Sequence, residues 1–280
     1  MAAMATAAVP ERPVLVAPDA FGGALRAAQV AGHVGRGLER AGLMPPDLCP
    51  VAGGGPGTLD ALLPQLGGEL VAGAVHDPSG RPLTVQLALI EDGATAIVEA
   101  ASAGSSHGVG ELVCAAVDAG AAVVVVAAGG PEPAGGGLGA LEAIDEHGGL
   151  RGARLVVLSG RRDASGLAGA LRGVAGAALE PAAPWILDAL DFDARMRAAR
   201  AVVTGEGTLD EGTLRGRVVG EIGTRTRQAG VPLHAVVGRD ALDGFGKRII
   251  DLQVVLEADT PEALEAAGER LGRALATGEA

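Results

Sequence analysis

The residues best suited to chemistry lie in one short segment, residues 202–217, which reads VVTGEGTLDEGTLRGR. Its apolar beginning predicts a buried strand that delivers Glu206 and Asp210 onto a turn. Two carboxylates this close in sequence could hold Mg²⁺ or accept a proton from a substrate hydroxyl group. The segment is therefore the first candidate for a catalytic or metal-binding site.

The same segment carries hydroxyl and guanidinium groups that suit anion binding. Thr213, Arg215 and Arg217 follow the two acids, and Thr204 precedes them. Arginine binds phosphate and carboxylate through paired N–H donors, and a threonine hydroxyl adds a further hydrogen bond. A capped turn that leads into a solvent-exposed, charged helix explains the same residues without a ligand, so the residues alone leave both interpretations open.

Three glycine-rich turns, at 53–57, 129–137 and 205–207, each follow a predicted strand and precede a predicted helix. In an open parallel sheet, ligands bind at the carboxyl ends of the strands, where helix N-termini favour phosphate. We therefore expect the turns to converge on one groove. The chain has 46 glycines and no complete dinucleotide-binding or P-loop motif, so no single turn identifies a ligand. The candidate binding glycines are Gly53, Gly54, Gly55, Gly57, Gly129, Gly130, Gly136, Gly205 and Gly207.

Apolar strands that alternate with helices must position these turns. The predicted strands are 14–17, 48–51, 122–128, 154–158, 201–204, 233–237 and 252–256, and the predicted helices are 24–41, 58–66, 109–119, 138–147, 185–200, 218–229 and 261–276. Continuous apolar strands are typical of a parallel sheet that is covered on both faces. The stretch from 70 to 100 instead predicts antiparallel strands.

The predicted fold class is α/β, with a mostly parallel, doubly wound sheet and a second, smaller β-containing lobe. We expect a flexible tail at residues 1–13. The α/β core is expected to comprise 14–76, 108–160 and 200–280. The smaller lobe is expected to comprise 77–107 and 161–199.

Composition restricts the partners. The chain has 280 residues, with 22 Lys and Arg against 34 Asp and Glu, which gives a net charge of −12. This charge argues against nucleic acid or an anionic membrane as a partner. The longest apolar stretch, 121–128, is too short to span a bilayer, and the first 13 residues lack a signal-peptide pattern. Cys49 and Cys114 are isolated, as is usual in a reducing compartment, so we expect a cytoplasmic protein.

The segment TGEGTLDEGTLRGR resembles the T-G-E-G-x-[LI]-D-x-[QT]-[ST]-x-x-G-K block of the bacterial glycerate kinase family. VLVAPDAFGGALRAAQVA, VAGGGPGTLDALL, the segment around GVGELVCAAVDAG and LDALDFDARMRAARAVV resemble further family motifs, in the same order along the chain. The resemblance implies two unequal α/β lobes with a cleft between them. It also implies transfer of a phosphoryl group from ATP to D-glycerate with Mg²⁺. Asp19, Glu206 and Asp210 would be the catalytic acids, and Glu206 and Asp210 would hold the metal.

Several family positions carry other residues in this chain. The motif lysine is replaced by Gly22 and the motif serine by Ala20. The other replaced polar positions are Gly53, Pro56, Pro131, Pro133, Ala134 and Gly135, and Arg217 stands in place of the last lysine. The family's N-P-L-x-G and P-Q-K-G-A segments are not found, and the chain is shorter than a typical member. Two interpretations stay open: an active glycerate kinase with a rebuilt site, or a catalytically inactive pseudokinase that binds a ligand or partner. The sequence does not predict an oligomeric state.

Overall fold

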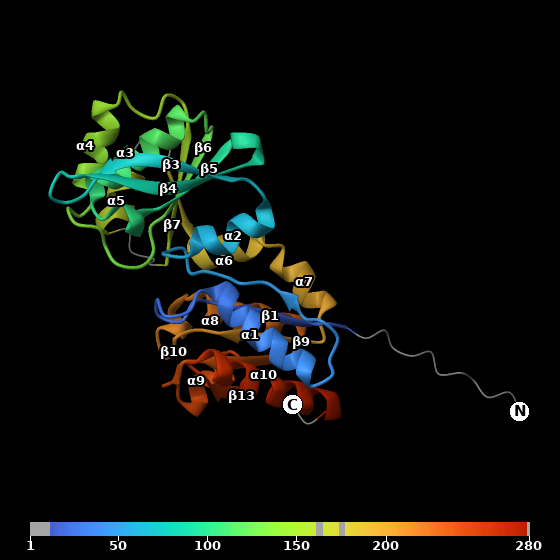
Figure 1. The fold of residues 1–280 in the computed structure, drawn as a ribbon. Helices are drawn as coiled ribbons and strands as arrows, with labels where there is room; N and C mark the ends of the chain where they lie inside the picture. Colours follow the sequence, from blue (N-terminus) through green and yellow to red (C-terminus); the bar gives the residue numbers. More distant parts are fainter. Residues whose placement is uncertain (1–11, 161–164, 174–176, 279–280) are drawn as a thin grey trace, which may run out of the picture.

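The computed structural model describes residues 12–160, 165–173 and 177–278, which form two α/β lobes joined by a helical layer (Figure 1). The first lobe contains a five-stranded parallel sheet in the order β13-β11-β9-β1-β2. Its strands are β1 (Val14–Pro18), β2 (Asp47–Leu48), β9 (Ala201–Gly205), β11 (Leu233–Val237) and β13 (Leu252–Glu257). A separate short pair, β10 (Thr208–Leu209) and β12 (Arg239–Asp240), extends beyond the strand ends.

Helices cover both faces of the first sheet because its central strands are apolar on both sides. On one face, α1 (Ala27–Arg40) packs against α10 (Pro261–Thr277). A Cβ on Gly37 would lie 2.1 Å from the Glu265 carbonyl oxygen, so only glycine allows the two backbones to approach this closely. The other helices of this lobe are α7 (Phe192–Ala198), α8 (Val218–Ala229) and α9 (Gly244–Ile249).

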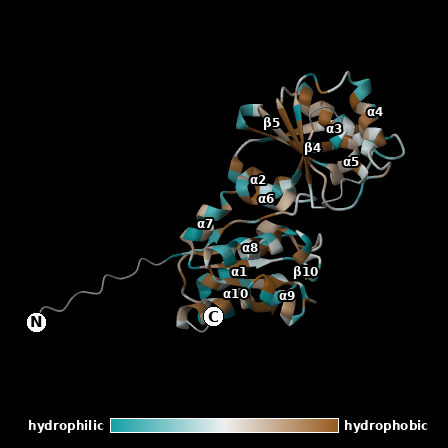
Figure 2. Ribbon diagram, turned by 180° about the vertical axis from the view of Figure 1, so that it is seen from behind, coloured by the Kyte–Doolittle hydropathy of each residue, from teal (hydrophilic) through white to brown (hydrophobic). Residues whose placement is uncertain are grey.

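The second lobe contains a six-stranded mixed sheet in the order β3-β4-β5-β6-β7-β8. Its strands are β3 (Glu69–His76), β4 (Pro82–Ile90), β5 (Thr95–Glu99), β6 (Val123–Ala127), β7 (Arg154–Ser159) and β8 (Ala178–Pro181). β4 pairs antiparallel with both β3 and β5, and β5 also begins a parallel run that continues through β6, β7 and β8. The helices α3 (Ser106–Asp118), α4 (Leu138–Glu146) and α5 (Gly166–Arg172) belong to this lobe, whose sheet is predominantly apolar (Figure 2).

Two helices, α2 (Thr58–Leu66) and α6 (Ala182–Ala189), form the layer between the sheets (Figure 1). Leu62 of α2 and Ile186 of α6 belong to one buried cluster together with Leu15 of the first sheet and Ile97 of the second. The lobes therefore share a continuous apolar core through these helices.

The predicted fold class is confirmed: the chain is α/β, and most strand pairs are parallel. The strands expected at 122–128 and 201–204 correspond to β6 and β9. The expected helix at 185–200 is instead two helices, because the chain turns at Asp191, whose φ is +50°.

The structure divides the chain differently from the predicted lobes. Residues 108–160 were expected in the same lobe as 14–76, but β6 and β7 pair with the antiparallel strands of the second sheet. The reason is that β5 forms parallel pairs with β6 along its full length, so the antiparallel hairpin extends one sheet instead of building its own lobe. The strands of the second sheet thus all lie between residues 69 and 181. Of the expected tail, only residues 12 and 13 are described, and 161–164 and 174–176 of the expected smaller lobe also lie outside the described residues. No helix within the described ranges is long and apolar enough to cross a membrane.

Candidate active site

Two of the predicted acids emerge side by side at the carboxyl end of the first sheet. β1 and β9 are parallel neighbours in which Pro18 lies opposite Gly205, so Asp19 and Glu206 each follow a strand at the same edge. The backbone N–H of Asp19 donates to the Gly205 carbonyl at 2.8 Å and holds the two strand ends together. A Cβ on Gly207 would lie 3.1 Å from the Gly22 backbone nitrogen, which explains a glycine at this crossing.

The segment from 206 to 217 folds around one guanidinium group. Glu206 is buried, and its Oε1 accepts a hydrogen bond from the Thr213 hydroxyl at 2.5 Å. Nη1 of Arg217 lies 3.3 Å from Oε2 of Glu206 and 3.1 Å from Oδ1 of Asp210. Oδ1 of Asp210 also accepts a hydrogen bond from the Gly212 N–H at 2.7 Å, so it closes the turn. The structure therefore brings together four predicted site residues: Glu206, Asp210, Thr213 and Arg217.

The environment of the acids changes their ionisation. Burial raises the pKa of Asp19 to about 7; the charge of Glu206 adds to this effect, while the Ala20 N–H and Arg217 oppose it. Burial also raises the pKa of Glu206, against the opposing effects of the Thr213 hydrogen bond and Arg217. A carboxylate with a pKa near the working pH is well suited to general base catalysis.

The glycine turns of both lobes meet beside these acids. The Gly129 N–H donates to the Gly54 carbonyl at 2.8 Å, and a Cβ on Gly55 would lie 2.7 Å from the Gly129 carbonyl oxygen. In the other direction, a Cβ on Gly53 would lie 3.7 Å from Oδ2 of Asp19. The turn at 53–57 thus contacts the first-lobe acid and the second-lobe turn at once. Through these contacts the three predicted turns meet at the junction between the lobes. Gly57 and Gly130 belong to the same two turns and adopt φ values of +88° and +89°.

Three predicted site residues do not join this cluster, and two of them make contacts elsewhere. The Thr204 hydroxyl is buried and donates to the Ala17 carbonyl at 2.9 Å, so it ties β9 to β1. Arg215 is exposed and pairs with Glu211 at 2.7 Å. Gly136 lies in an exposed loop, and a Cβ there would meet no atom within 4 Å.

The sequence interpretation missed two charged residues at this junction. Glu99 ends β5 and is buried, and its carboxylate accepts the Leu59 N–H at 2.8 Å at the start of α2. The signal was an acid at the end of an apolar strand, TAIVE. The other residue is Arg26, which directly precedes α1 and pairs with Asp60 of α2 at 3.4 Å.

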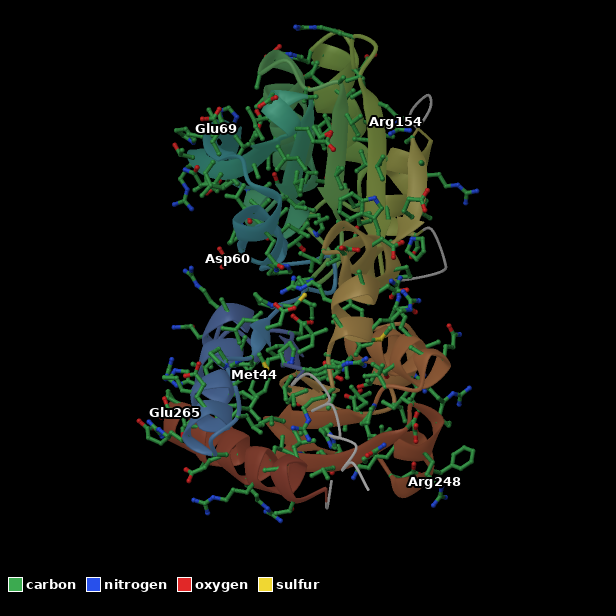
Figure 3. All side chains as sticks on the ribbon, turned by 90° about the vertical axis from the view of Figure 1, so that its right-hand side faces the viewer. Met44, Asp60, Glu69, Arg154, Arg248 and Glu265 are labelled. Carbon is green, nitrogen blue, oxygen red and sulfur yellow. The ribbon has the colours of Figure 1, made fainter. Side chains whose placement is uncertain are left out.

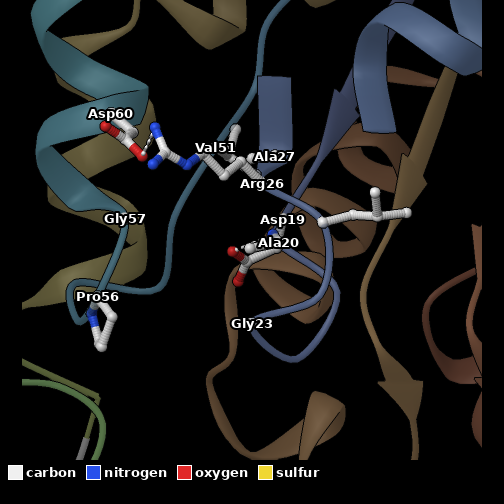
Figure 4. A pocket seen from close by; sticks show the side chains of 10 residues that line it. Asp19, Ala20, Gly23, Arg26, Ala27, Val51, Pro56, Gly57 and Asp60 are labelled. Atoms are coloured by element: carbon white, nitrogen blue, oxygen red, sulfur yellow. Dashed lines mark hydrogen bonds and ion pairs between the residues drawn. The ribbon is translucent and has the colours of Figure 1, made fainter. Parts of the chain in front are cut away.

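A cavity of about 180 Å³ opens between these elements (Figure 4). Its walls include Asp19 and Gly23 from the loop after β1, Arg26, and Pro56 and Asp60 from the other side. Asp60 lies at the level of the junction between the lobes (Figure 3). The cavity thus joins the acid with the raised pKa to a positively charged side chain.

The carboxylates of Glu206 and Asp210, which surround Arg217, could supply two of the ligands of a divalent cation. No group of three or more His, Cys, Asp or Glu side chains in the described part of the chain could hold a metal ion by itself. The Arg217 nitrogen nevertheless has a carboxylate oxygen of Glu206 and one of Asp210 as neighbours. Mg²⁺ commonly binds through one or two carboxylates, with water and substrate phosphates as the other ligands. These two acids fit that role once Arg217 turns away.

Comparisons with known proteins give consistent results. The model of the glycerate kinase family matches residues 14–151 and 148–276. An uncharacterized protein of Mycobacterium bovis is 30% identical over 326 aligned residues, which cover 89% of this chain and 84% of that protein. Glycerate kinase of Bacillus subtilis is 32% identical over 149 residues, which cover 47% of this chain and only 38% of that protein. The crystal structure of a putative glycerate kinase 2 from Salmonella typhimurium superimposes with a TM-score of 0.78 at 19% identity, over 96% of this chain and 99% of that one, which establishes a shared fold.

Proposed function

Because this chain belongs to the glycerate kinase family, we propose that it transfers the γ-phosphoryl group of ATP to a hydroxyl group of D-glycerate. The observation that carries the proposal is the meeting of Asp19, Glu206 and the glycine turns at the junction between two lobes. Phosphoryl transfer depends on positioned charges around the moving group and a base near the attacking hydroxyl.

In the proposed reaction, Asp19 is the base. Its carboxylate takes the proton of the acceptor hydroxyl, whose oxygen forms a bond to the γ-phosphorus. The bond from that phosphorus to the β–γ bridging oxygen breaks, and ADP leaves with the electron pair. The proton on Asp19 then passes to solvent. A pKa of about 7 keeps a useful fraction of this carboxylate ionised at neutral pH.

Glu206 and Asp210 are the proposed metal ligands. When bound, Mg²⁺ would neutralise charge on the phosphates of ATP. Arg217 must leave its two carboxylate partners for this to happen, and its side chain is half exposed, so solvent-side space is available to it. Once released, its guanidinium is free to pair with a phosphate group.

Backbone N–H groups of the turn at 53–57, of Gly130 and of Gly207 are the proposed phosphate contacts. The Gly129 N–H already donates to the Gly54 carbonyl, and Gly205 is buried within β9, so these two glycines shape the site instead of binding phosphate. Glycine allows a phosphate to approach the backbone closely, and no lysine lies in these turns. Thr213 supports the site indirectly, because its hydroxyl fixes the Glu206 carboxylate. We also propose a cytoplasmic location, in keeping with the free cysteines Cys49 and Cys114.

A coupled ADP-release assay with D-glycerate tests the proposal. We expect Mg²⁺-dependent ADP release that Asp19→Asn lowers by at least about 100-fold, in line with the usual contribution of a general base. If the wild-type protein releases no ADP while ATP or glycerate still raises its melting temperature, the protein is a ligand-binding pseudokinase. The replaced family positions, such as Gly22 and Ala20, are the observation that favours this second candidate.

A further inference from the structure

Arg26 is the only positively charged side chain among the described residues that line the 180 Å³ cavity beside Asp19 (Figure 4). Its backbone is fixed, because its N–H donates to the Gln29 side chain at 2.9 Å at the start of α1. Its side chain extends across the junction toward α2. A cation therefore stands at one wall of the cavity and the proposed base at another.

The ion pair between Arg26 and Asp60 is a weak one. The side chains of Arg26 and Asp60 are 75% and 53% exposed, and the closest nitrogen and oxygen lie 3.4 Å apart. Exposed pairs of this kind contribute little to stability. A guanidinium has five donors, so a ligand carboxylate can join Asp60 or replace it.

The cavity is small for a ligand site. Its volume of about 180 Å³ lies below the roughly 300–1,000 Å³ usual for drug-sized ligands, and suits a molecule of a few carbon atoms. The walls between the charged groups are apolar, with Val51, Leu25 and Pro56. A short acid with a carboxylate at one end and a hydroxyl at the other matches this arrangement.

We propose that Arg26 binds the carboxylate of the acceptor in this cavity and so selects hydroxy acids over neutral alcohols. The proposal rests on the proposed function, and it makes Arg26 a specificity-determining residue. It also suggests how the chain manages without the motif lysine at Gly22, because Arg26 returns a positive charge to the same loop-and-helix segment. In this arrangement Asp60 competes with the ligand for the guanidinium.

Because Asp60 and the ligand compete for Arg26, substitutions of Arg26 and Asp60 should change glycerate affinity in opposite directions. Arg26→Gln should weaken D-glycerate binding by at least about 10-fold, because a hydrogen bond between charged groups contributes about 1.5–3 kcal/mol. Asp60→Asn should strengthen binding, by up to about fivefold, because the competing carboxylate is gone. A merely structural ion pair would respond in the same direction to both substitutions.

Calorimetry and thermal shift with D-glycerate, lactate, glycerol and ADP supply the readouts. The wild-type protein should prefer the two carboxylates to glycerol, and Arg26→Gln should lose that preference while its affinity for ADP is retained. Arg36→Gln is the matched control, since it changes the same residue type farther along the same segment, where Arg36 pairs with Glu265. We expect glycerate binding by this control to equal that of the wild type.

The outcomes separate this proposal from the proposed function. Equal glycerate affinity in the wild type and Arg26→Gln, or weaker ADP binding alone, would overturn the role of Arg26 even if ADP release is normal. Carboxylate binding that depends on Arg26 without any turnover would support the role and reject the kinase reaction. A wild-type protein that binds no carboxylate would also overturn the role, and the ADP-release assay then decides on the kinase separately.

Discussion

Asp19→Asn should make the protein more stable above neutral pH, although Asp19 is the proposed base. Its pKa is about 7 in the folded state, against 3.8 for an ordinary exposed aspartate. The folded chain therefore binds more protons than the unfolded chain between these two values, and the stability that this proton supplies is lost as pH rises from about 4 to about 7. Asparagine cannot ionise, so the variant should escape this loss.

The magnitude follows from the pH window. Between pH 5 and pH 7 about two units of the shift are realised, at 1.36 kcal/mol each, which sets an upper limit of about 3 kcal/mol. Residual solvent contact of Asp19 and relaxation of the loop around it reduce this figure. We expect the stability of the variant relative to the wild type to increase by about 1–3 kcal/mol between pH 5 and pH 8.

Urea unfolding at pH 5, 6, 7 and 8 in the presence of EDTA measures this difference. Asp145→Asn, the same substitution at an exposed position of α4, controls for the removal of one negative charge. If the stability curves of Asp19→Asn and the wild type stay parallel over this range, Asp19 ionises as an ordinary exposed carboxylate. Asp19 would then lack the raised pKa on which its proposed role as a base near neutral pH depends.

Three further predictions concern other residues of the site and core. Arg217→Gln should lower stability by about 1–2 kcal/mol without metal, because its two carboxylate partners then repel each other, and Mg²⁺ should raise the melting temperature of the variant more than that of the wild type. His234→Val should stabilise the protein by about 1–3 kcal/mol, because both ring nitrogens are buried without a partner among the described residues. Burial lowers the pKa of His234, so the stability of the wild-type protein should fall as the pH drops below about 6.5. Urea unfolding should show that the variant lacks this contribution to the loss of stability at low pH. Gly54→Ala should destabilise by more than about 2 kcal/mol in thermal unfolding, since φ is +82° there and the new Cβ would lie 2.3 Å from Cβ of Ala182; a variant as stable as the wild type would contradict the close packing at this turn.

Strands and helices were predictable because a buried element shows a characteristic pattern of apolar residues in its own sequence. The apolar runs at 122–128 and 201–204 both correspond to real strands, since each strand is buried on both faces. The pairing partners of these strands could not be predicted in the same way. That β6 continues the sheet of β5 instead of joining β1 depends on contacts between distant segments, and nothing in either strand's own sequence records its neighbour.

The candidate site likewise has a part that the sequence predicts and a part that only the structure reveals. Glu206, Asp210 and Arg217 lie within one short segment, so their proximity followed from the sequence. Contact between Gly54 and Gly129 requires that the two lobes meet, and the approach of Arg26 to Asp60 requires that α2 cross the junction. Exposed side chains such as these produce no periodic pattern, so only the structure reveals that they share a cavity.

The placement of the second sheet also has a consequence for the order in which the newly made chain folds. All six of its strands come from one continuous stretch, 69–181, whereas β1 of the first sheet lies between β2 and β9. On the ribosome, β1 is made first but must wait for β9, β11 and β13 before its sheet can form. The inserted lobe should therefore fold before the lobe that contains the N-terminal strand. The two helices that cover this sheet, α2 and α6, directly flank that stretch. A nascent chain stalled soon after α6 has left the ribosome should therefore contain a protease-resistant core from residues 58–189 and a protease-sensitive segment before it.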